Sequence, residues 1–298
     1  MKKSTMVQDN AFRYVVSVGA LLMIGITFAI GAFLLWRGSA TFTQYGHSVM
    51  EFLFSTAWAP ADDTVGGGKV GAGIFIIGSL ISCGLALLIS TPFSIGAALF
   101  MTEISPRLGK TLLQPTVEIF VGIPSVVYGW LGLTILVPWI KEVFNLQFGF
   151  SVLAAAIVLA VMIFPTITSI AADAIQSVPK SFRQAGYGLG ATRWQVIYQI
   201  VLPSAKSGIM TGIVLGLARA FGEALAVAMV IGKTKALPDS LLAPTTNLTS
   251  AIASDMGGAM EGSEYNMALW TMALLLFIIS ALCIVTIHAL GKKESIHD

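Results

Sequence analysis

The chain has 298 residues, of which 56% are hydrophobic and only 11% charged, and its mean hydropathy is +0.84. A water-soluble domain needs more charge than this to cover its surface, so the composition indicates an integral membrane protein. The formal net charge of +2 is small and gives no reason to expect nucleic acid as a partner.

Six apolar segments follow one another along the chain, at residues 14–36, 71–101, 112–138, 150–172, 207–232 and 266–290. Each exceeds the length of about 20 residues that is needed to cross a bilayer as a helix. Because lipid offers no hydrogen bonds, backbone amides must be paired inside such segments, and continuous apolar runs predict helices rather than barrel strands. The first segment is too long for the apolar part of a signal peptide, so we expect it to be retained. The predicted fold class is an all-α integral membrane protein with six transmembrane helices.

Basic residues are unevenly distributed between alternate loops. If the N-terminus lies inside, the inner side carries eleven Lys and Arg residues and the outer side carries five. Because cytoplasmic loops are richer in Lys and Arg, we expect the N- and C-termini to be cytoplasmic. Glu103 and Asp173 lie at inner helix ends, where we interpret both as solvated carboxylates.

The two longest outer loops, 37–70 and 233–265, are rich in small and polar residues, and we assign them no conformation. In the first loop, Gly66, Gly68 and Gly71 form a GxGxxG pattern. No strand precedes this pattern, so we interpret it as a flexible turn rather than a nucleotide-binding loop.

No catalytic residue and no metal ligand is predicted. The cysteines and histidines are scattered without ligand spacing, at Cys83, Cys283, His47, His288 and His297. Asn247-Leu248-Thr249 matches a glycosylation sequon, a pattern that matters only in a eukaryotic secretory setting.

The third apolar segment contains Gly122 and Pro124, so we expect its helix to bend and to expose backbone groups to a pathway through the protein. Ser125 and Tyr128 follow this bend. Their hydroxyl groups are candidate pathway residues, although Tyr128 is equally well explained by packing.

The cytoplasmic loop 173–206 is polar but patterned, which indicates two short helices separated by a glycine break and ended by a proline. Its stretch "QAGYGLGATRWQVIYQIVLP" resembles the E-A-A-x3-G-x9-I-x-L-P loop of ABC importer permeases. The matching positions are Gln184, Ala185, Gly186, Gly190, Ile200, Leu202 and Pro203. Gln184 replaces Glu and Gly186 replaces Ala in the family pattern. The resemblance implies that residues from about Gln184 to Arg193 contact a separate ATPase subunit.

The fifth apolar segment places Arg219 near the membrane centre and Glu223 four residues later. On one continuous helix these positions share a face, so we expect an ion pair. An unpaired charge at the bilayer centre costs about 2.5–3.5 kcal/mol on insertion scales, and an apolar pair would often be as stable as an ionic one. We therefore interpret both as pathway residues. Arg219 offers donors that suit phosphate oxygens, and Glu223 holds the guanidinium and keeps anion binding weak.

The alternative for these two charges is a buried ion pair that only locks two helices together. A stripe of small residues runs along the same segment and predicts close helix packing under either interpretation. It consists of Gly208, Gly212, Gly216 and Ala220.

Three further stretches, "PFSIGAALFMTEISPRLGK", "GIPSVVYGWLGL" and "GLARAFGEALAVAMVIG", resemble the PstC-type permeases of phosphate ABC importers. The resemblance implies a type I ABC importer permease fold in a bacterial or archaeal cytoplasmic membrane. It also implies a second, PstA-like permease, two PstB-like ATPase subunits and an extracytoplasmic PstS-like phosphate-binding protein. ATP and Mg would then act through the ATPase partner, with no cofactor on this chain.

The expected domain organisation follows from the segments and the resemblance. Residues 1–70 hold the cytoplasmic N-terminus, the first transmembrane helix and an outer loop. Residues 71–290 form the permease core with the coupling loop 173–206, and residues 291–298 form a cytoplasmic tail.

Two alternatives remain from the sequence. The first is an importer of another oxyanion, such as molybdate or sulfate. The second is a gradient-driven secondary transporter in which Arg219 and Glu223 relay ions. The coupling loop argues against the second alternative, because a gradient-driven carrier needs no ATPase contact.

Overall fold

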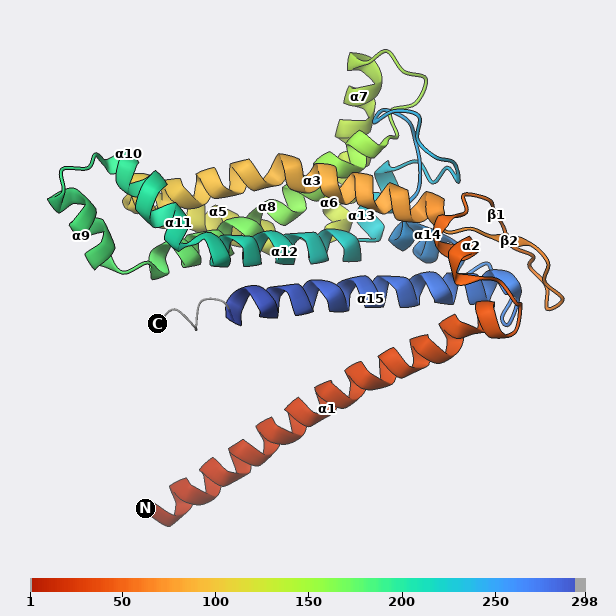
Figure 1. Ribbon diagram of the computed structural model, residues 1–298, viewed down its shortest axis with the longest axis horizontal. Helices are drawn as coiled ribbons and strands as arrows, with labels where there is room; N and C mark the ends of the chain where they lie inside the picture. Colours follow the sequence, from red (N-terminus) through yellow and green to blue (C-terminus); the bar gives the residue numbers. More distant parts are fainter. Residues whose placement is uncertain (1, 293–298) are drawn as a thin grey trace.

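The computed structural model describes the backbone of residues 2–292 and the side chains of residues 12–287 and 289 (Figure 1). Long helices form a bundle. The only sheet in the described residues pairs two short antiparallel strands, β1 (Trp58–Ala59) and β2 (Lys69–Val70). The fold is all-α in class, as predicted. Apart from its first two residues, the predicted tail 291–298 lies outside the described residues.

Five helical stretches are long and apolar enough to cross a membrane, and a bent pair supplies a sixth. The five contain α1 (Lys2–Thr43), α3 (Gly73–Leu99) with the π-helix η1 (Phe100–Ile104), α6 (Ser125–Leu131) with η3 (Gly132–Leu136) and α7 (Val137–Val143), α8 (Val152–Ser177) and α15 (Glu264–Lys292). In the bent pair, the run Arg193–Ser204 meets α12 (Lys206–Gly222) at an angle of 66°. Counting this pair as one span confirms the six predicted spans.

The third predicted helix, 112–138, is broken as expected. The helical run before the break begins earlier than predicted, with α4 (Pro106–Leu108) and η2 (Gly109–Leu113), and continues as α5 (Gln114–Gly122). Helix α6 follows after Pro124. Ile123 has an extended backbone (φ −71°, ψ 128°), because the residue before a proline avoids the helical region.

The fifth predicted helix, 207–232, is not continuous, which the sequence did not lead us to expect. Helix α12 ends at Gly222, Glu223 has an extended backbone (φ −77°, ψ 121°), and α13 (Leu225–Val230) follows. Arg219 and Glu223 therefore do not share one helix face.

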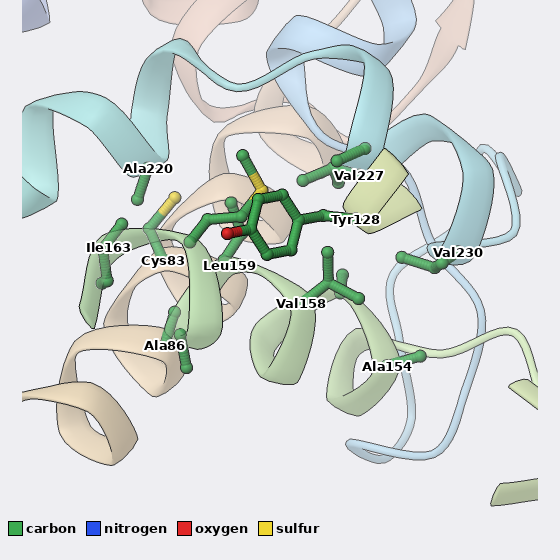
Figure 2. Close-up of a cluster of buried hydrophobic side chains, with 14 of the residues drawn as sticks. Cys83, Ala86, Tyr128, Ala154, Val158, Leu159, Ile163, Ala220, Val227 and Val230 are labelled. Carbon is green, nitrogen blue, oxygen red and sulfur yellow. The ribbon is translucent and has the colours of Figure 1, made fainter. Parts of the chain in front are cut away.

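Helix α8 lies at the centre of the bundle and packs along α3 and α12. Figure 2 shows the apolar cluster around it, with side chains such as Cys83 of α3, Leu159 of α8 and Val227 of α13. The predicted stripe of small residues faces α8. A Cβ added at Gly216 would lie 2.7 Å from Ile167, and one at Gly208 would lie 2.5 Å from Ala174. The stripe therefore serves close packing between helices.

One end of the bundle, the α9 end, carries the loop between α8 and α12 (Figure 1). This loop contains α9 (Lys180–Gly188), α10 (Arg193–Val196), η4 (Ile197–Val201) and α11 (Leu202–Ser204). We call residues 180–196 the helical hairpin. The start of α1 and the end of α15 lie toward the same end of the bundle.

The opposite end, the β1 end, contains the two long loops, which hold the short helices α2 (Val49–Phe54) and α14 (Leu248–Asp255). Glu264, the first residue of α15, has a fully buried side chain. Its carboxylate accepts hydrogen bonds from the backbone N–H groups of Ala61, Gly67 and Gly68 at 2.7–3.0 Å. The glycine-rich turn that we interpreted as flexible is therefore fixed on a buried carboxylate.

His47 completes this cluster. Its Nε2 lies 2.7 Å from Oε1 of Glu264, and its Nδ1 lies 3.3 Å from Oε2 of Glu51. Burial lowers the pKa of His47, but the hydrogen bonds and charges of Glu264 and Glu51 outweigh burial and raise this pKa above its ordinary value of 6.5. The charged imidazolium is thus favoured by folding.

We predict that His47 makes the stability of the β1 end depend on pH. Because its pKa is raised by folding, the stabilisation is complete below about pH 6.5 and is lost as the pH rises through the higher pKa of the folded protein. Thermal unfolding of the purified protein in detergent, measured from pH 5.5 to 9, should show this decline. The decline should be absent in His47→Gln and present in His288→Gln, an equal change near the far end of α15. An unchanged decline in His47→Gln would contradict the assignment.

Candidate functional site

Arg219 lies in the last turn of α12, inside the bundle and partly buried. Its Nη1 donates a hydrogen bond to Oγ1 of Thr166 on α8, at 2.7 Å. The carbonyl end of a helix carries partial negative charge, which favours a cation in the last turn. The break after Gly222 therefore stabilises Arg219 at its position.

Glu223 does not pair with Arg219, and this corrects the ion pair expected from the sequence: the ion pairs among the described residues do not include these two side chains. The extended backbone at Glu223 directs its carboxylate to the start of α13, where Oε1 accepts a hydrogen bond from the N–H of Ala226 at 3.1 Å. The N–H end of a helix favours an anion. Each charge is thus placed at a helix end of opposite polarity.

Two threonines of this site were missed by the sequence reasoning: Thr166 and Thr249. Oγ1 of Thr249 donates to the backbone carbonyl of Glu223 at 2.7 Å and so satisfies a group exposed by the break. Thr249 belongs to α14, whose cap is Asn247 in a capping box with Ser250. The Asn-Leu-Thr tripeptide is therefore a buried helix start. The stretch 245–250 is rich in Thr and Ser, and this was the feature of the sequence that could have pointed to Thr249.

The other two predicted pathway residues lie at the α5–α6 break. Ser125 is half-buried and begins α6. Tyr128 is buried in the cluster of Figure 2, and its hydroxyl donates to the carbonyl of Phe120 across the break, at 2.8 Å. The buried cluster around Tyr128 also contains Ala220 and Phe221, which directly follow Arg219 on α12. Arg219, Tyr128 and the two breaks therefore occupy one region of the interior.

The predicted coupling-loop residues divide into a surface set and a packing set. Gln184 and Ala185 are exposed on α9, and Pro203 is exposed on α11. Ile200 and Leu202 pack against the apolar cluster beneath the helical hairpin.

Two glycines of this loop have separate structural reasons. Gly190 adopts φ +81° in the turn after α9, a conformation that favours glycine. Gly186 is buried, and an added Cβ would lie 2.6 Å from Cδ1 of Ile200 and 3.0 Å from Cγ2 of Val196. Glycine in place of the family's Ala at position 186 therefore allows α9 to pack closely against η4.

The surface of the helical hairpin and η4 exposes large apolar side chains. These residues are 48–89% exposed, and they are Phe182, Tyr187, Leu189, Trp194 and Tyr198. Tyr187 and Leu189 lie within the stretch from about Gln184 to Arg193 that the resemblance assigned to the ATPase contact, whereas the other three lie outside it. An apolar patch on an otherwise polar loop is typical of a surface that binds another protein.

Arg183 fixes the helical hairpin to the bundle. Its Nη2 lies 2.7 Å from Oε1 of Glu103, and their side chains are only 17% and 12% exposed. Its Nη1 and Nη2 also donate to the carbonyls of Val178 and Ile175 at the end of α8. Our interpretation of Glu103 as a solvated carboxylate is therefore wrong, because the fold brings Arg183 to it across 80 residues of sequence.

Comparison with known proteins gives one family and several close relatives. A family model described as "Binding-protein-dependent transport system inner membrane component" matches residues 90–291. The chain is 48% identical over 284 residues to the probable ABC transporter permease protein YqgH of Bacillus subtilis, covering 95% of this chain and 91% of that protein. It is 34% identical over 296 residues to the phosphate transport system permease protein PstC of Haemophilus influenzae, covering 93% and 91%.

Two solved structures share the fold. A bacterial alginate ABC transporter in complex with an alginate-bound periplasmic protein gives a TM-score of 0.63 at 16% identity, covering 96% of each chain. The MetNI methionine ABC transporter in an inward-facing conformation gives a TM-score of 0.50 at 20% identity, covering 72% of this chain and 91% of that chain. At this identity the likeness concerns the fold alone.

We predict that Gly186→Ala is about 1 kcal/mol less stable than Gly188→Ala, because its new methyl group overpacks against Cδ1 of Ile200 and Cγ2 of Val196. Adding Ile200→Val removes Cδ1, so the double variant should lose less stability than the sum of the two single changes. Gly188→Ala is the matched control, because a Cβ added to this glycine of the same helix would meet open space. Thermal unfolding in detergent compares the stability of the two single variants, the double variant and the control. Equal losses in Gly186→Ala and Gly188→Ala would contradict the packing argument.

Proposed function

Because the chain belongs to the binding-protein-dependent transport system inner membrane components, we propose that it is a permease subunit of an ATP-driven ABC importer for inorganic phosphate. The observation that carries the substrate is the similarity to PstC phosphate permeases, at 33–35% identity over 92–95% of the chain. The anion-compatible site around Arg219 supports the same substrate.

We assign Arg219 to transient binding of the phosphate anion. A guanidinium has five N–H donors in a planar arrangement that matches phosphate oxygens. Among the described contacts of Arg219, one hydrogen bond goes to Thr166 and none to a carboxylate. A partly buried arginine without an ionic partner is expensive in a membrane, and an anionic substrate offsets this cost while it passes.

We assign the remaining pathway residues to tuning this binding. The carboxylate of Glu223 is held at the start of α13, near the chain break that follows Arg219. Its negative charge opposes an anion, which keeps the site weak enough for release. The hydroxyls of Ser125 and Tyr128 lie at the second break and offer neutral hydrogen-bonding groups.

We further propose that the α9 end faces the cytoplasm, with both termini, and that the helical hairpin contacts an ATPase subunit. The exposed apolar residues of the hairpin supply the contact surface, together with Gln184 and Ala185. The assembly would contain a PstA-like permease, two PstB-like ATPases and a PstS-like phosphate-binding protein at the β1 end. ATP and Mg would be bound by the ATPase, and we assign no cofactor to this chain.

The complex that co-purifies with the tagged chain should hydrolyse ATP faster when phosphate and the binding protein are supplied. Reconstituted vesicles should show this stimulation with phosphate and not with sulfate or molybdate. ATPase rate and uptake of radioactive phosphate measure the two halves of the proposal. Stimulation by sulfate or molybdate alone would contradict the assignment of phosphate as the substrate. Absence of any co-purified ATPase would contradict the assignment as an ATP-driven importer.

Arg219→Ala should reduce phosphate uptake by about tenfold or more, because a charge-assisted hydrogen bond contributes about 1.5–3 kcal/mol. The complex should still assemble, because the side-chain hydrogen bond that the variant removes among the described residues is the one to Thr166. Arg219→Lys should retain part of the uptake, because lysine keeps the charge without the planar donors. Arg13→Ala, which removes an exposed arginine from α1, is the control. Normal uptake by Arg219→Ala would show that the residue is outside the pathway.

A further inference from the structure

Both arms of the helical hairpin are tied to the same end of α3. From α9, Arg183 forms the ion pair with Glu103 of η1, the π-helical continuation of α3. From α10, Nη2 of Arg193 donates to the backbone carbonyl of Ile104, the last residue of η1, at 2.9 Å. A displacement of the hairpin therefore acts directly on the end of α3.

The ion pair is the stronger of these two ties. Oε1 of Glu103 accepts from both Nε and Nη2 of Arg183, at 3.0 and 2.7 Å. Both side chains are largely shielded from water, which strengthens their attraction and makes the loss of one partner costly for the other.

Helix α3 and η1 together run for 32 residues, from Gly73 to Ile104, along α8. At the other end of α3, Oγ of Ser79 accepts a hydrogen bond from the N–H of Leu248 at 3.0 Å. Gly78 lies against the backbone of Thr246, so closely that an added Cβ would be 2.1 Å from its carbonyl oxygen. The far end of α3 is thus in direct contact with the start of α14.

The start of α14 in turn contacts the break beside Arg219. Thr249 follows Leu248 and donates to the carbonyl of Glu223 at 2.7 Å. The contacts therefore run from α9 through Glu103 and α3 to Leu248 and Thr249, and from there to Glu223.

We propose that the Arg183–Glu103 ion pair is a positioning element of transport, which transmits movement of the helical hairpin through α3 to the α14 segment that holds the α12–α13 break. Helix α3 and η1 form one continuous helical run from Gly73 to Ile104 despite Pro92 inside it, and displacement of this run changes the hold of Thr249 on Glu223 and so the access to Arg219. This inference rests on the proposed function, since it requires an ATPase that moves the hairpin.

Double-variant analysis of the whole complex in vesicles tests the pair, with phosphate moved per ATP hydrolysed as the readout. Arg183→Ala and Glu103→Gln should each lower this ratio by about tenfold, within the usual range of coupling between sites. ATP hydrolysis without the binding protein should continue. The combined variant should lose no more than either single variant, because both remove the same interaction. Arg183→Lys should recover part of the ratio, and Arg107→Ala, an exposed arginine near Glu103 in sequence, should leave it unchanged.

The far end of α3 offers a matched pair of serines. Ser79→Ala removes the contact with Leu248 and should also lower the ratio. Ser82→Ala should not, because Ser82 is equally buried but its hydroxyl donates to carbonyls of its own helix, those of Gly78 and Ser79.

Three results would overturn the proposal. The first is an unchanged ratio of phosphate moved per ATP in Arg183→Ala and Glu103→Gln, and the second is a combined variant whose loss is the product of the two single losses. The third is failure of both Glu103→Gln and Arg183→Lys to assemble, which would make the pair purely structural. Measurements on the unaltered complex test the proposed function separately from the ion pair. If the unaltered complex hydrolyses ATP but moves sulfate or molybdate instead of phosphate, the proposed substrate is wrong. The role of the ion pair is then tested with the ratio of that anion moved per ATP hydrolysed.

Discussion

The break between α12 and α13 separates two charges and gives each a helix end of opposite polarity. Arg219 lies at the carbonyl end of α12, and Glu223 lies at the amide end of α13. Lipid supplies no hydrogen bonds, so a broken span persists only if protein groups satisfy the exposed backbone. Thr249 does this at the Glu223 carbonyl, and Tyr128 does the same for Phe120 at the other break.

The helices around these breaks pack closely together, because glycines at their contacts leave room for close approach. Gly208 and Gly216 let α12 approach α8, and Gly78 lets the start of α14 approach α3. Close packing matters here because association of helices within lipid gains little from the hydrophobic effect and depends on contact. The α14 segment can therefore reach from the β1 end into the bundle and bond the polar groups at the break.

The α9 end combines an exposed apolar surface with a buried ionic attachment. The exposed residues, such as Leu189 and Trp194, suit a partner that the chain does not itself provide. Arg183 and Glu103 hold this surface to α3. If this surface contacts the ATPase that we propose, its movement can reach the bundle because the surface is firmly joined to the end of α3.

The sequence by itself determined the membrane class, the six spans, the bend at Pro124 and the two-helix form of the loop, because hydropathy, proline and local spacing act over short stretches of chain. It also marked Arg219 as a candidate pathway residue. Only the tertiary structure decided the break at Glu223, the partners Thr166 and Thr249, and the burial of Glu103 and Glu264. Each of these depends on groups far apart in sequence, such as Arg183 for Glu103 or Gly67 for Glu264. A helical pattern predicts which residues share a face only while the helix continues, and whether it continues depends on partners that folding brings from elsewhere.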